Sequence, residues 1–280
     1  MKRIIGLLLA SIIVLSACSG GGSSKKVTVG VASNDTAAWE KVKELAKKDD
    51  IDLEIKHFSD YNVPNKALSD GDIDMNAFQH FAFLNEYKKA HKDAKIEAMS
   101  TTVLAPLGIY SKKVKDIKNV KDGAQVMIPN DVSNQARALK LLESAGLIKL
   151  KDNFDLSSTT KDIKDNPKHL KIKEVDAQQT ARVLDDVDIS VINNGVATKA
   201  GLDAKKDPIY LESSTSEAVK PYINLIAVNS KDKDNKTYKK IVDLYHSKEA
   251  QEALKKDTKD GEKAVDLSRK EIKDIEDSLK

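Results

Sequence analysis

The stretch VMIPNDVSNQARALKLLESAG, residues 126–146, contains a complete strand–turn–helix unit. Val126–Pro129 is a short apolar run typical of a buried strand, and a polar turn follows it. From Asn134 to Ala145 the apolar side chains recur on one stripe of a predicted helix, which Gly146 closes. Units of this kind predict an α/β protein with parallel sheets and helices on both faces.

The same alternation of strand-like and helical segments continues through the rest of the chain. Ile51–Phe58 alternates with a period of two, as a half-buried strand does, and Ala37–Lys48 carries apolar residues at helical spacing. These segments are too many for one small sheet, so we predict two α/β lobes. Residues 27–107 and 224–280 would form lobe I and residues 108–223 lobe II, with a cleft between them that suits a small ligand.

The amino-terminal residues predict a secreted, lipid-anchored protein. Ile4–Leu15 is an apolar run that follows a short basic start and is too short for a membrane-spanning helix, which needs ~20 residues. It leads into Leu-Ser-Ala-Cys, which resembles a bacterial lipobox ending at Cys18, the single cysteine of the chain. We therefore predict a lipoprotein signal peptide at 1–17, and a lipidated cysteine with a flexible linker at 18–26. The alternative is an ordinary signal peptide followed by a chance cysteine.

Acylation of Cys18, with palmitate or a similar chain, would place the protein at the cell membrane, facing away from the cytoplasm. Each buried CH₂ group contributes ~0.8 kcal/mol, so several acyl chains on one cysteine would anchor the protein stably. Without a second cysteine the chain forms no internal disulfide, and its stability must come from burial of a core.

The charge composition argues against a nucleic-acid partner and draws attention to arginine. Removal of Lys2 and Arg3 would lower the formal net charge from +3 to +1, and no concentrated basic face is expected. Of the 47 basic residues only four are arginines: Arg3, Arg137, Arg182 and Arg269. Because lysine supplies the general surface charge, an arginine in the body is expected to serve through its planar, five-donor guanidinium.

Arg137 lies one turn into the helix that follows the strand at 126–129. The amino terminus of a helix offers free backbone N–H groups and partial positive charge, which suit an anion. The guanidinium of Arg137 is placed to grip the same anion with two parallel hydrogen bonds, as it would a carboxylate. The alternative is that Asp131 or Ser133 simply caps the helix and Arg137 is a surface residue.

Two asparagines are further candidates for ligand contacts. Asn193 follows the apolar strand at 189–192, and in open α/β sheets ligands bind beyond the carboxyl ends of the strands. Asn-Gly sequences are also common in turns, so this pattern alone leaves the role of Asn193 open. Asn224 lies inside an apolar strand and needs a hydrogen-bond partner, which would be either a ligand amino group or backbone.

The stretch GDIDMNAFQHFAFLNEY, residues 71–87, holds His80 and three of the five phenylalanines. The five histidines are scattered without metal-ligand spacing, and no nucleophile motif accompanies His80, so neither a metal site nor catalysis is expected. In a helix that begins at Gln79, His80 and Phe83 share one face and would project into the cleft. Phe78 and Phe81 would then belong to the core.

Several motifs together resemble the NlpA/MetQ family of bacterial substrate-binding lipoproteins, which serve methionine-type ABC importers. The motifs are Phe58-Ser-Asp-Tyr61, Pro64-Asn65-x-Ala67-Leu68, Gly71-Asp-Ile-Asp74, Asn76-Ala-Phe-Gln-His80, Gly108-x-Tyr110-Ser111, Pro129-Asn-Asp-x-x-Asn134-x-x-Arg137, Gly146-Leu-Ile-Lys-Leu150, Val191-Ile-Asn193 and Pro221-Tyr-x-Asn224-Leu225. The resemblance covers nearly all of the mature chain. It implies a two-lobed, periplasmic-binding-protein-like fold that closes on an amino acid, usually methionine.

The resemblance also implies a role for each candidate residue. Tyr61, His80 and Phe83 would line the side-chain pocket of the ligand, with Phe83 at a position where the family usually has tyrosine. Arg137 would hold the carboxylate beside Asn134. Asn193 and Asn224 would bind the amino end.

One departure leaves the identity of the ligand open. Val196 stands where the family commonly has a second tyrosine, which would leave space beside the amino end. We expect L-methionine, with D-methionine, a methionine-containing dipeptide or another apolar amino acid as alternatives. A metal-binding lipoprotein is less favoured. The expected partners are an ABC permease and its ATPase, no cofactor is expected, and the protein is expected to be a monomer.

Overall fold

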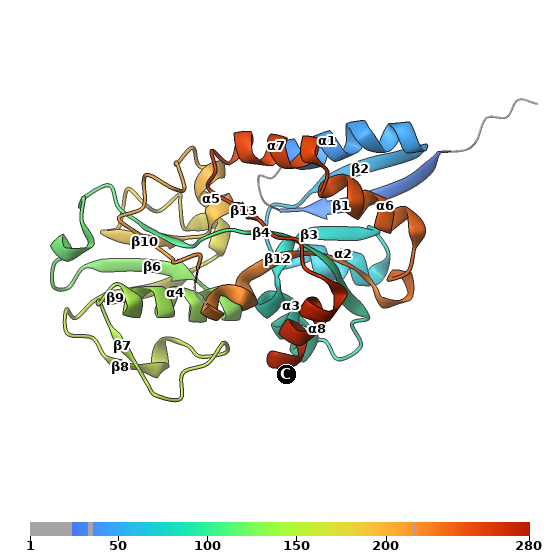
Figure 1. The fold of residues 1–280 in the computed structure, drawn as a ribbon. Helices are drawn as coiled ribbons and strands as arrows, with labels where there is room; N and C mark the ends of the chain where they lie inside the picture. The colour runs from blue at the N-terminus through green and yellow to red at the C-terminus, as the bar shows by residue number, and fades with distance from the viewer. Residues whose placement is uncertain (1–23, 33–35, 216) are drawn as a thin grey trace, which may run out of the picture.

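The structure is a computed structural model that describes residues 24–32, 36–215 and 217–280. The predicted signal peptide and Cys18 lie outside these residues. Two separate sheets organise the described chain (Figure 1). In spatial order the first consists of β13 (Lys263–Ala264), β4 (Ile96–Leu104), β12 (Ile223–Asn229), β3 (Met75–His80), β1 (Lys25–Val31) and β2 (Ile51–His57). The second consists of β11 (Tyr210–Leu211), β5 (Gly108–Tyr110), β10 (Ile189–Ile192), β6 (Gln125–Pro129) and β9 (Lys171–Val175).

Both sheets are mixed, whereas the sequence predicted parallel sheets. β1 runs parallel to β2 and β3, and β6 runs parallel to β9 and β10. β12 is antiparallel to both β3 and β4, and β5 is antiparallel to β10 and β11. β5 and β12 are the first strands along the chain after each crossing from one sheet to the other. Each begins at the edge where the neighbouring parallel strands end, and it therefore runs in the opposite direction.

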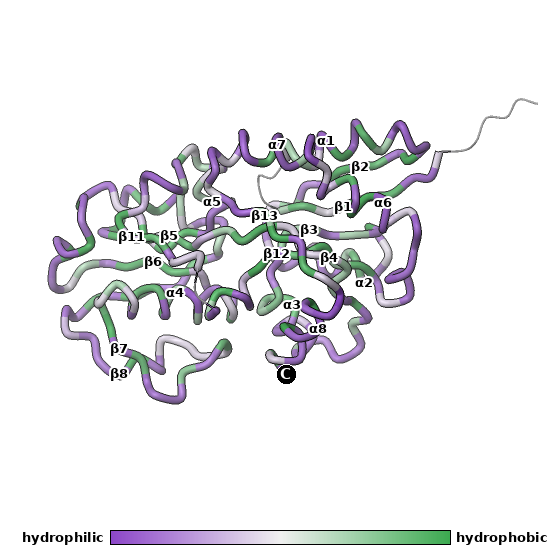
Figure 2. The backbone as a smooth tube through the Cα atoms, viewed as in Figure 1, coloured by the Kyte–Doolittle hydropathy of each residue, from purple (hydrophilic) through white to green (hydrophobic). Residues whose placement is uncertain are grey.

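Helices cover both faces of each sheet. The α-helices are α1 (Thr36–Ala46), α2 (Val63–Asp70), α3 (Phe81–Ala90), α4 (Val132–Ser144), α5 (Asn194–Lys199), α6 (Lys236–Tyr245), α7 (Lys248–Asp257) and α8 (Arg269–Ser278). A small hairpin of β7 (Lys149–Leu150) and β8 (Ile163–Asp165) lies beyond α4. The strands are mainly hydrophobic and the outer loops hydrophilic, as expected for a sheet buried on both faces (Figure 2).

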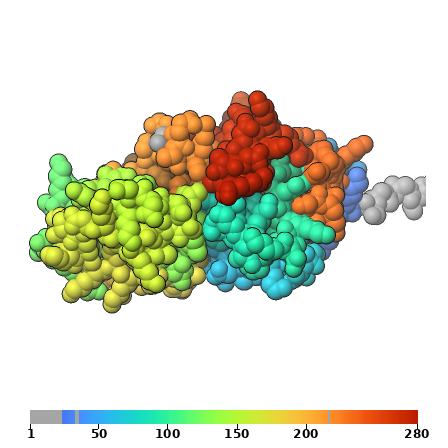
Figure 3. All heavy atoms as spheres, turned by 90° about the horizontal axis from the view of Figure 1, so that it is seen from below, coloured from blue at the N-terminus to red at the C-terminus, as the bar shows by residue number. Residues whose placement is uncertain are grey.

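Each sheet has its own hydrophobic core. On one face of the first sheet, α1, α6 and α7 bury a cluster around Trp39, whose ring centroid lies 5.0 Å from that of Tyr245. On the other face, α2, α3 and α8 bury a second cluster that includes Phe81. The second sheet packs against α4 through Leu139 and Leu142. The two bodies are distinct and meet along a seam (Figure 3), so the predicted two-lobed α/β fold is confirmed.

The chain passes between the two sheets at two places. It leaves the first sheet after β4 and enters the second at β5, and it returns from β11 to β12 through residues 212–222. Packing is tight where it enters β5. A Cβ atom on Gly108 would lie 2.6 Å from a ring carbon of Tyr110, so a larger residue would displace that buried ring.

Candidate functional site

A narrow cavity lies where the two lobes meet. It is lined by Tyr61, Phe78, Gln79, His80, Phe83, Val103, Ala105, Asn134, Arg137, Asn193, Asn194, Gly195, Asn224 and Glu262. All seven residues predicted to bind ligand are in this set. The free volume is ≈ 40 Å³, which corresponds to about three waters. A larger ligand therefore requires the lobes or the lining side chains to move apart.

Arg137 projects from α4 and is almost completely buried, at 3% exposure. Its Nε atom donates a 2.9 Å hydrogen bond to Oε1 of Glu212, and one terminal nitrogen, Nη2, donates to Oε2 of the same carboxylate. Nη2 also donates to the carbonyl oxygen of Ala105 at 3.0 Å. The guanidinium carbon lies 4.4 Å from the ring centroid of Tyr222, within cation–π range.

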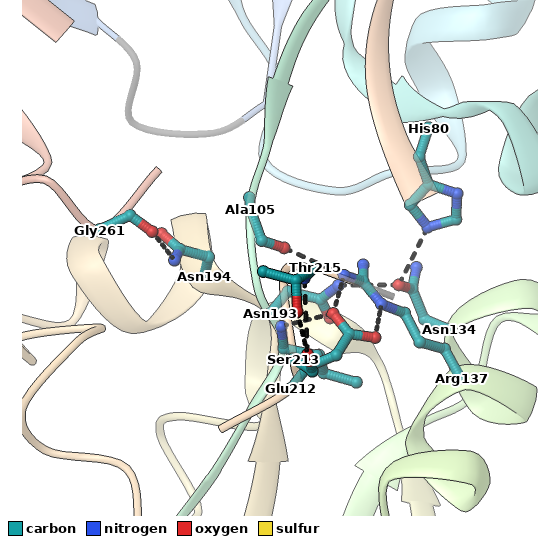
Figure 4. A network of polar contacts seen from close by, with 11 residues as sticks. His80, Ala105, Asn134, Arg137, Asn193, Asn194, Glu212, Ser213, Thr215 and Gly261 are labelled. Atoms are coloured by element: carbon teal, nitrogen blue, oxygen red, sulfur yellow. Dashed lines mark hydrogen bonds and ion pairs between the residues drawn. The ribbon is translucent and has the colours of Figure 1, made fainter. Parts of the chain in front are cut away.

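This geometry changes the role expected for the Arg137 guanidinium. The two-pronged grip predicted for a ligand carboxylate is made here with Glu212, which does not line the cavity (Figure 4). Burial disfavours the charge of Arg137, but the neighbouring Glu212 carboxylate outweighs it and raises the pKa of the guanidinium. Figure 4 shows the second terminal nitrogen, Nη1, on the side of the guanidinium toward His80. Nε and Nη2 are thus the two nitrogens of Arg137 that donate to Glu212 and Ala105.

Glu212 also joins the two segments that cross between the lobes. It lies directly after β11, and its Oε2 accepts a 3.1 Å hydrogen bond from the backbone N–H of Leu107, just before β5. Arg137 contacts Ala105 in the same segment. A single ion pair thus connects α4 to both crossing segments.

The amino terminus of α4 is capped by the side chain of Asp131. Asp131 is the N-cap, and its Oδ1 accepts a 3.0 Å hydrogen bond from the N–H of Asn134. Burial raises the pKa of the Asp131 carboxyl, although the hydrogen bonds from Asn134 oppose this shift. Asp131 thus caps the helix terminus, as the capping alternative expected. The other half of that alternative is wrong, because Arg137 is buried at the cavity rather than on the surface.

His80 ends β3 and caps the next helix, which begins at Phe81 rather than at Gln79 as predicted. Its Nδ1 accepts a 3.1 Å hydrogen bond from the backbone N–H of Phe83, so Nε2 carries the proton and donates to Oδ1 of Asn134 at 3.2 Å. Burial, and secondarily the charge of Arg137, lowers the pKa of His80 to about 3. The ring is therefore neutral at physiological pH.

Asn134 links the residues of the two lobes. Its Oδ1 accepts from His80 and, at 2.8 Å, from Nδ2 of Asn193, while its Nδ2 donates to Asp131 at 2.9 Å. His80 comes from the first sheet, whereas Asn134 and Asn193 follow strands of the second. The network fixes the orientation of the Asn134 amide, which is 2% exposed.

Aromatic rings form another part of the cavity wall. The ring centroid of Phe78 lies 5.9 Å from that of Tyr61 and 5.6 Å from that of Phe83, and Phe83 lies 6.2 Å from His80. Phe81 is in the core, as predicted, but Phe78 is only half-buried and lines the cavity, so its assignment to the core was wrong. The reason is that β3 continues to His80, and alternate residues of a strand share a face.

Asn224 lies near the start of β12, directly opposite His80 in the register of the sheet. It is half-buried and reaches the cavity, as the polar residue in an apolar strand suggested.

The sequence patterns did not single out several residues that line or adjoin the site, among them Glu212, Tyr222 and Glu262. Tyr222 belongs to a quoted motif. Glu212 follows a short apolar run and Glu262 lies in a charged segment, and neither has a distinguishing pattern.

The described residues offer no evident metal site or membrane span. Within 24–32, 36–215 and 217–280, no group of three or more His, Cys, Asp or Glu side chains could hold a metal ion. In the same ranges, no helix has the length and apolar character needed to cross a membrane.

Comparison with known proteins identifies the family. The model of the NlpA lipoprotein family matches residues 27–266. The chain belongs to the NlpA lipoprotein family. This confirms the resemblance found in the sequence.

Three relatives show how far the similarity extends for this NlpA lipoprotein. It is 78% identical to protein PG110 from Staphylococcus aureus, with a TM-score of 0.90, covering 91% of this chain and 100% of that one. A nutrient binding protein from Burkholderia cenocepacia, solved bound to methionine, is 45% identical with a TM-score of 0.81, covering 85% and 99%. The D-methionine-binding lipoprotein MetQ of Escherichia coli is 40% identical over 256 residues, covering 90% and 93%.

Proposed function

We propose that this NlpA lipoprotein captures methionine in the interlobe cavity and delivers it to an ABC importer. One observation carries the proposal. A buried guanidinium from one lobe and a group of aromatic rings from the other line the same cavity. The methionine bound to the Burkholderia relative supports the same ligand here.

Each part of methionine has a complementary group in the cavity. The carboxylate would accept hydrogen bonds from Nη1 of Arg137, whose other edge is held by Glu212. The amide oxygens of Asn193 and Asn224 would accept from the ammonium group. The thioether would pack against Tyr61, Phe78 and Phe83, because sulfur–aromatic contacts are favourable.

The proposed transport cycle depends on closure of the two lobes around the ligand. We propose that lobe I comprises residues 27–107 with 224–280, and lobe II residues 108–223. A ligand that contacts both lobes favours the closed form over the open one, by the difference in its affinity for the two. The closed protein, tethered through lipidated Cys18 outside the cytoplasm, would then dock as a monomer on a permease driven by an ATPase. No bond is made or broken, so the protein is not an enzyme.

Calorimetry on protein that has been unfolded and refolded, to remove carried-over ligand, tests this proposal. We expect heat of binding with L-methionine and weaker or no heat with leucine, glutamate or Zn²⁺. D-methionine and methionine dipeptides should be titrated in parallel. The sequence left both open as ligands, although Val196 is buried in a hydrophobic cluster and does not line the cavity. Binding of another ligand with no response to any form of methionine would overturn the proposal.

A further inference from the structure

The end of β3 carries a β-bulge beside the cavity. Phe78, Gln79 and His80 all line the cavity. In the pairing of β3 with β12, Ala77 and Gln79 lie opposite consecutive residues of β12, so Phe78 is the extra residue between them. A bulge of this kind bends the strand and changes the direction of its side chains, and bulges are frequent beside functional sites.

Three buried amides, Asn65, Asn76 and Gln79, form a hydrogen-bonded triad next to this bulge. Nδ2 of Asn65 donates to Oε1 of Gln79 at 2.7 Å, and Nε2 of Gln79 donates to Oδ1 of Asn65 at 2.6 Å. Nδ2 of Asn76 donates to Oδ1 of Asn65 at 3.0 Å, and Oδ1 of Asn76 accepts from Gln79 at 2.9 Å. None of the three residues is more than 2% exposed. Loss of one member would leave buried polar groups without partners, which is unfavourable.

The triad depends on the bulge. Asn76 and Gln79 are three positions apart, and side chains at that separation in a regular strand point to opposite faces. The extra residue Phe78 brings the two amides to one side, where they are hydrogen-bonded. These hydrogen bonds therefore favour the bulged strand. In a regular strand, the side chains on one side of Phe78 would turn to the other face.

The triad also fixes α2 against β3. Asn65 lies in the first turn of α2, and Tyr61 lies two residues before that helix. The ring centroid of Tyr61 is 5.9 Å from that of Phe78. Although Gln79 lines the cavity, its amide nitrogen donates to both other members of the triad. The donors of this amide are therefore already used within the protein.

We propose that Asn65, Asn76 and Gln79 are positioning residues for ligand binding, because they hold the bulge that places Phe78 in the cavity wall. The inference deepens the proposed function, since it assumes that the methionine side chain contacts the aromatic rings. Asn65 does not line the cavity, so it acts on the ligand through Phe78. Its effect on affinity should therefore disappear when the Phe78 ring is absent.

The test is a double-mutant cycle on methionine affinity. Calorimetry would compare the ligand-free wild-type chain with Asn65→Ala, Phe78→Leu and the variant that carries both substitutions. Thermal melting of the same proteins measures how much stability each has lost. If Asn65→Ala does not fold, Asn76→Ala replaces it in the cycle, because that substitution leaves the reciprocal pair of Asn65 and Gln79 intact.

The matched control is Asn85→Ala. Asn85 lies in α3 of the same lobe, and its Nδ2 donates a 2.9 Å hydrogen bond to the carbonyl oxygen of Leu279. It does not line the cavity. The control therefore removes an amide of the same size that has no connection to the bulge.

We expect Asn65→Ala to weaken methionine binding about five- to tenfold in the wild-type background, as loss of an aromatic contact does, and less than about twofold in the Phe78→Leu background. Asn85→Ala should lower the melting temperature without changing affinity. The proposal is overturned if Asn65→Ala lowers only the melting temperature, or if it weakens binding equally in both backgrounds. A wild-type chain that binds no form of methionine would instead overturn the proposed function.

Discussion

The two walls of the cavity are built in different ways. The aromatic wall comes from one short region, residues 61–83, and its rings are half-buried and in loose edge contacts. The charged wall depends on Arg137 and Glu212, which are 75 positions apart and pair completely in a buried environment. A buried charge is costly without its partner, whereas an apolar surface tolerates change. Substitutions should therefore affect stability mainly at the charged wall and ligand preference mainly at the aromatic wall.

The largest effect is expected from Glu212→Gln. Loss of the carboxylate would leave Arg137 buried without its counter-charge, which costs about 3–5 kcal/mol of unfolding free energy. Urea denaturation of the ligand-free protein measures this cost. The matched control is Glu217→Gln, which removes an exposed pair with Lys220 and should cost less than ~1 kcal/mol. Equal effects of the two substitutions would show that the Arg137 pair is not stabilising.

The next effect is a pH dependence that originates from His80. Its pKa is about 3 in the folded protein, against ~6.5 when unfolded, so the unfolded chain gains a proton that the folded chain does not. The stability that this histidine provides is complete above pH 6.5 and decreases as the pH falls toward 3. Between pH 7 and pH 5 the loss is ~2 kcal/mol.

His80→Asn keeps a side chain able to cap α3 but does not titrate. The ~2 kcal/mol loss of unfolding free energy that His80 causes between pH 7 and pH 5 should therefore be absent from this variant. Urea melts of both proteins at pH 7 and pH 5 give the comparison. Identical pH dependence would mean that the ring is not held neutral by its surroundings.

A smaller effect is expected at Phe78 and Phe81, where the same substitution should change ligand affinity in one case and stability in the other. Phe78→Leu should weaken methionine binding about five- to tenfold, because it removes an aromatic contact worth ~1 kcal/mol from the cavity wall. Phe81→Leu should lower stability by ~1 kcal/mol but leave affinity unchanged, since Phe81 lies in the core. Calorimetry and thermal melting distinguish them. A loss of affinity in both variants would contradict the division between wall and core.

The smallest effect is expected from Phe83→Tyr. A hydroxyl added to this half-buried ring should change stability by less than ~0.5 kcal/mol. Its effect should appear instead as a shift in relative affinity among L-methionine, D-methionine and methionine dipeptides, measured by competition. A large fall in melting temperature would show that the ring is packed more tightly than its exposure indicates.

Much of the fold was predictable because its units are local. The strand at β6 and the helix α4 that follows it were recognised from one continuous stretch, and the other strand–helix alternations predicted two α/β lobes in the same way. Strand directions were not predictable, because β5 and β12 are oriented by crossings between lobes. The start of α3 was misplaced by two residues, since the cap formed by His80 depends on which way its ring turns.

The sequence alone was enough to single out Arg137, because the chain has few arginines. Its motifs were enough to predict that seven residues line one cleft. The tertiary structure decided what holds them there. Glu212 is hydrogen-bonded to one edge of the Arg137 guanidinium. Phe78 lines the cavity, and so does Glu262 from the carboxyl-terminal part of the chain. The physical reason is that residue type and periodicity depend on near neighbours, whereas charge compensation depends on whichever groups the folded chain brings within hydrogen-bond distance.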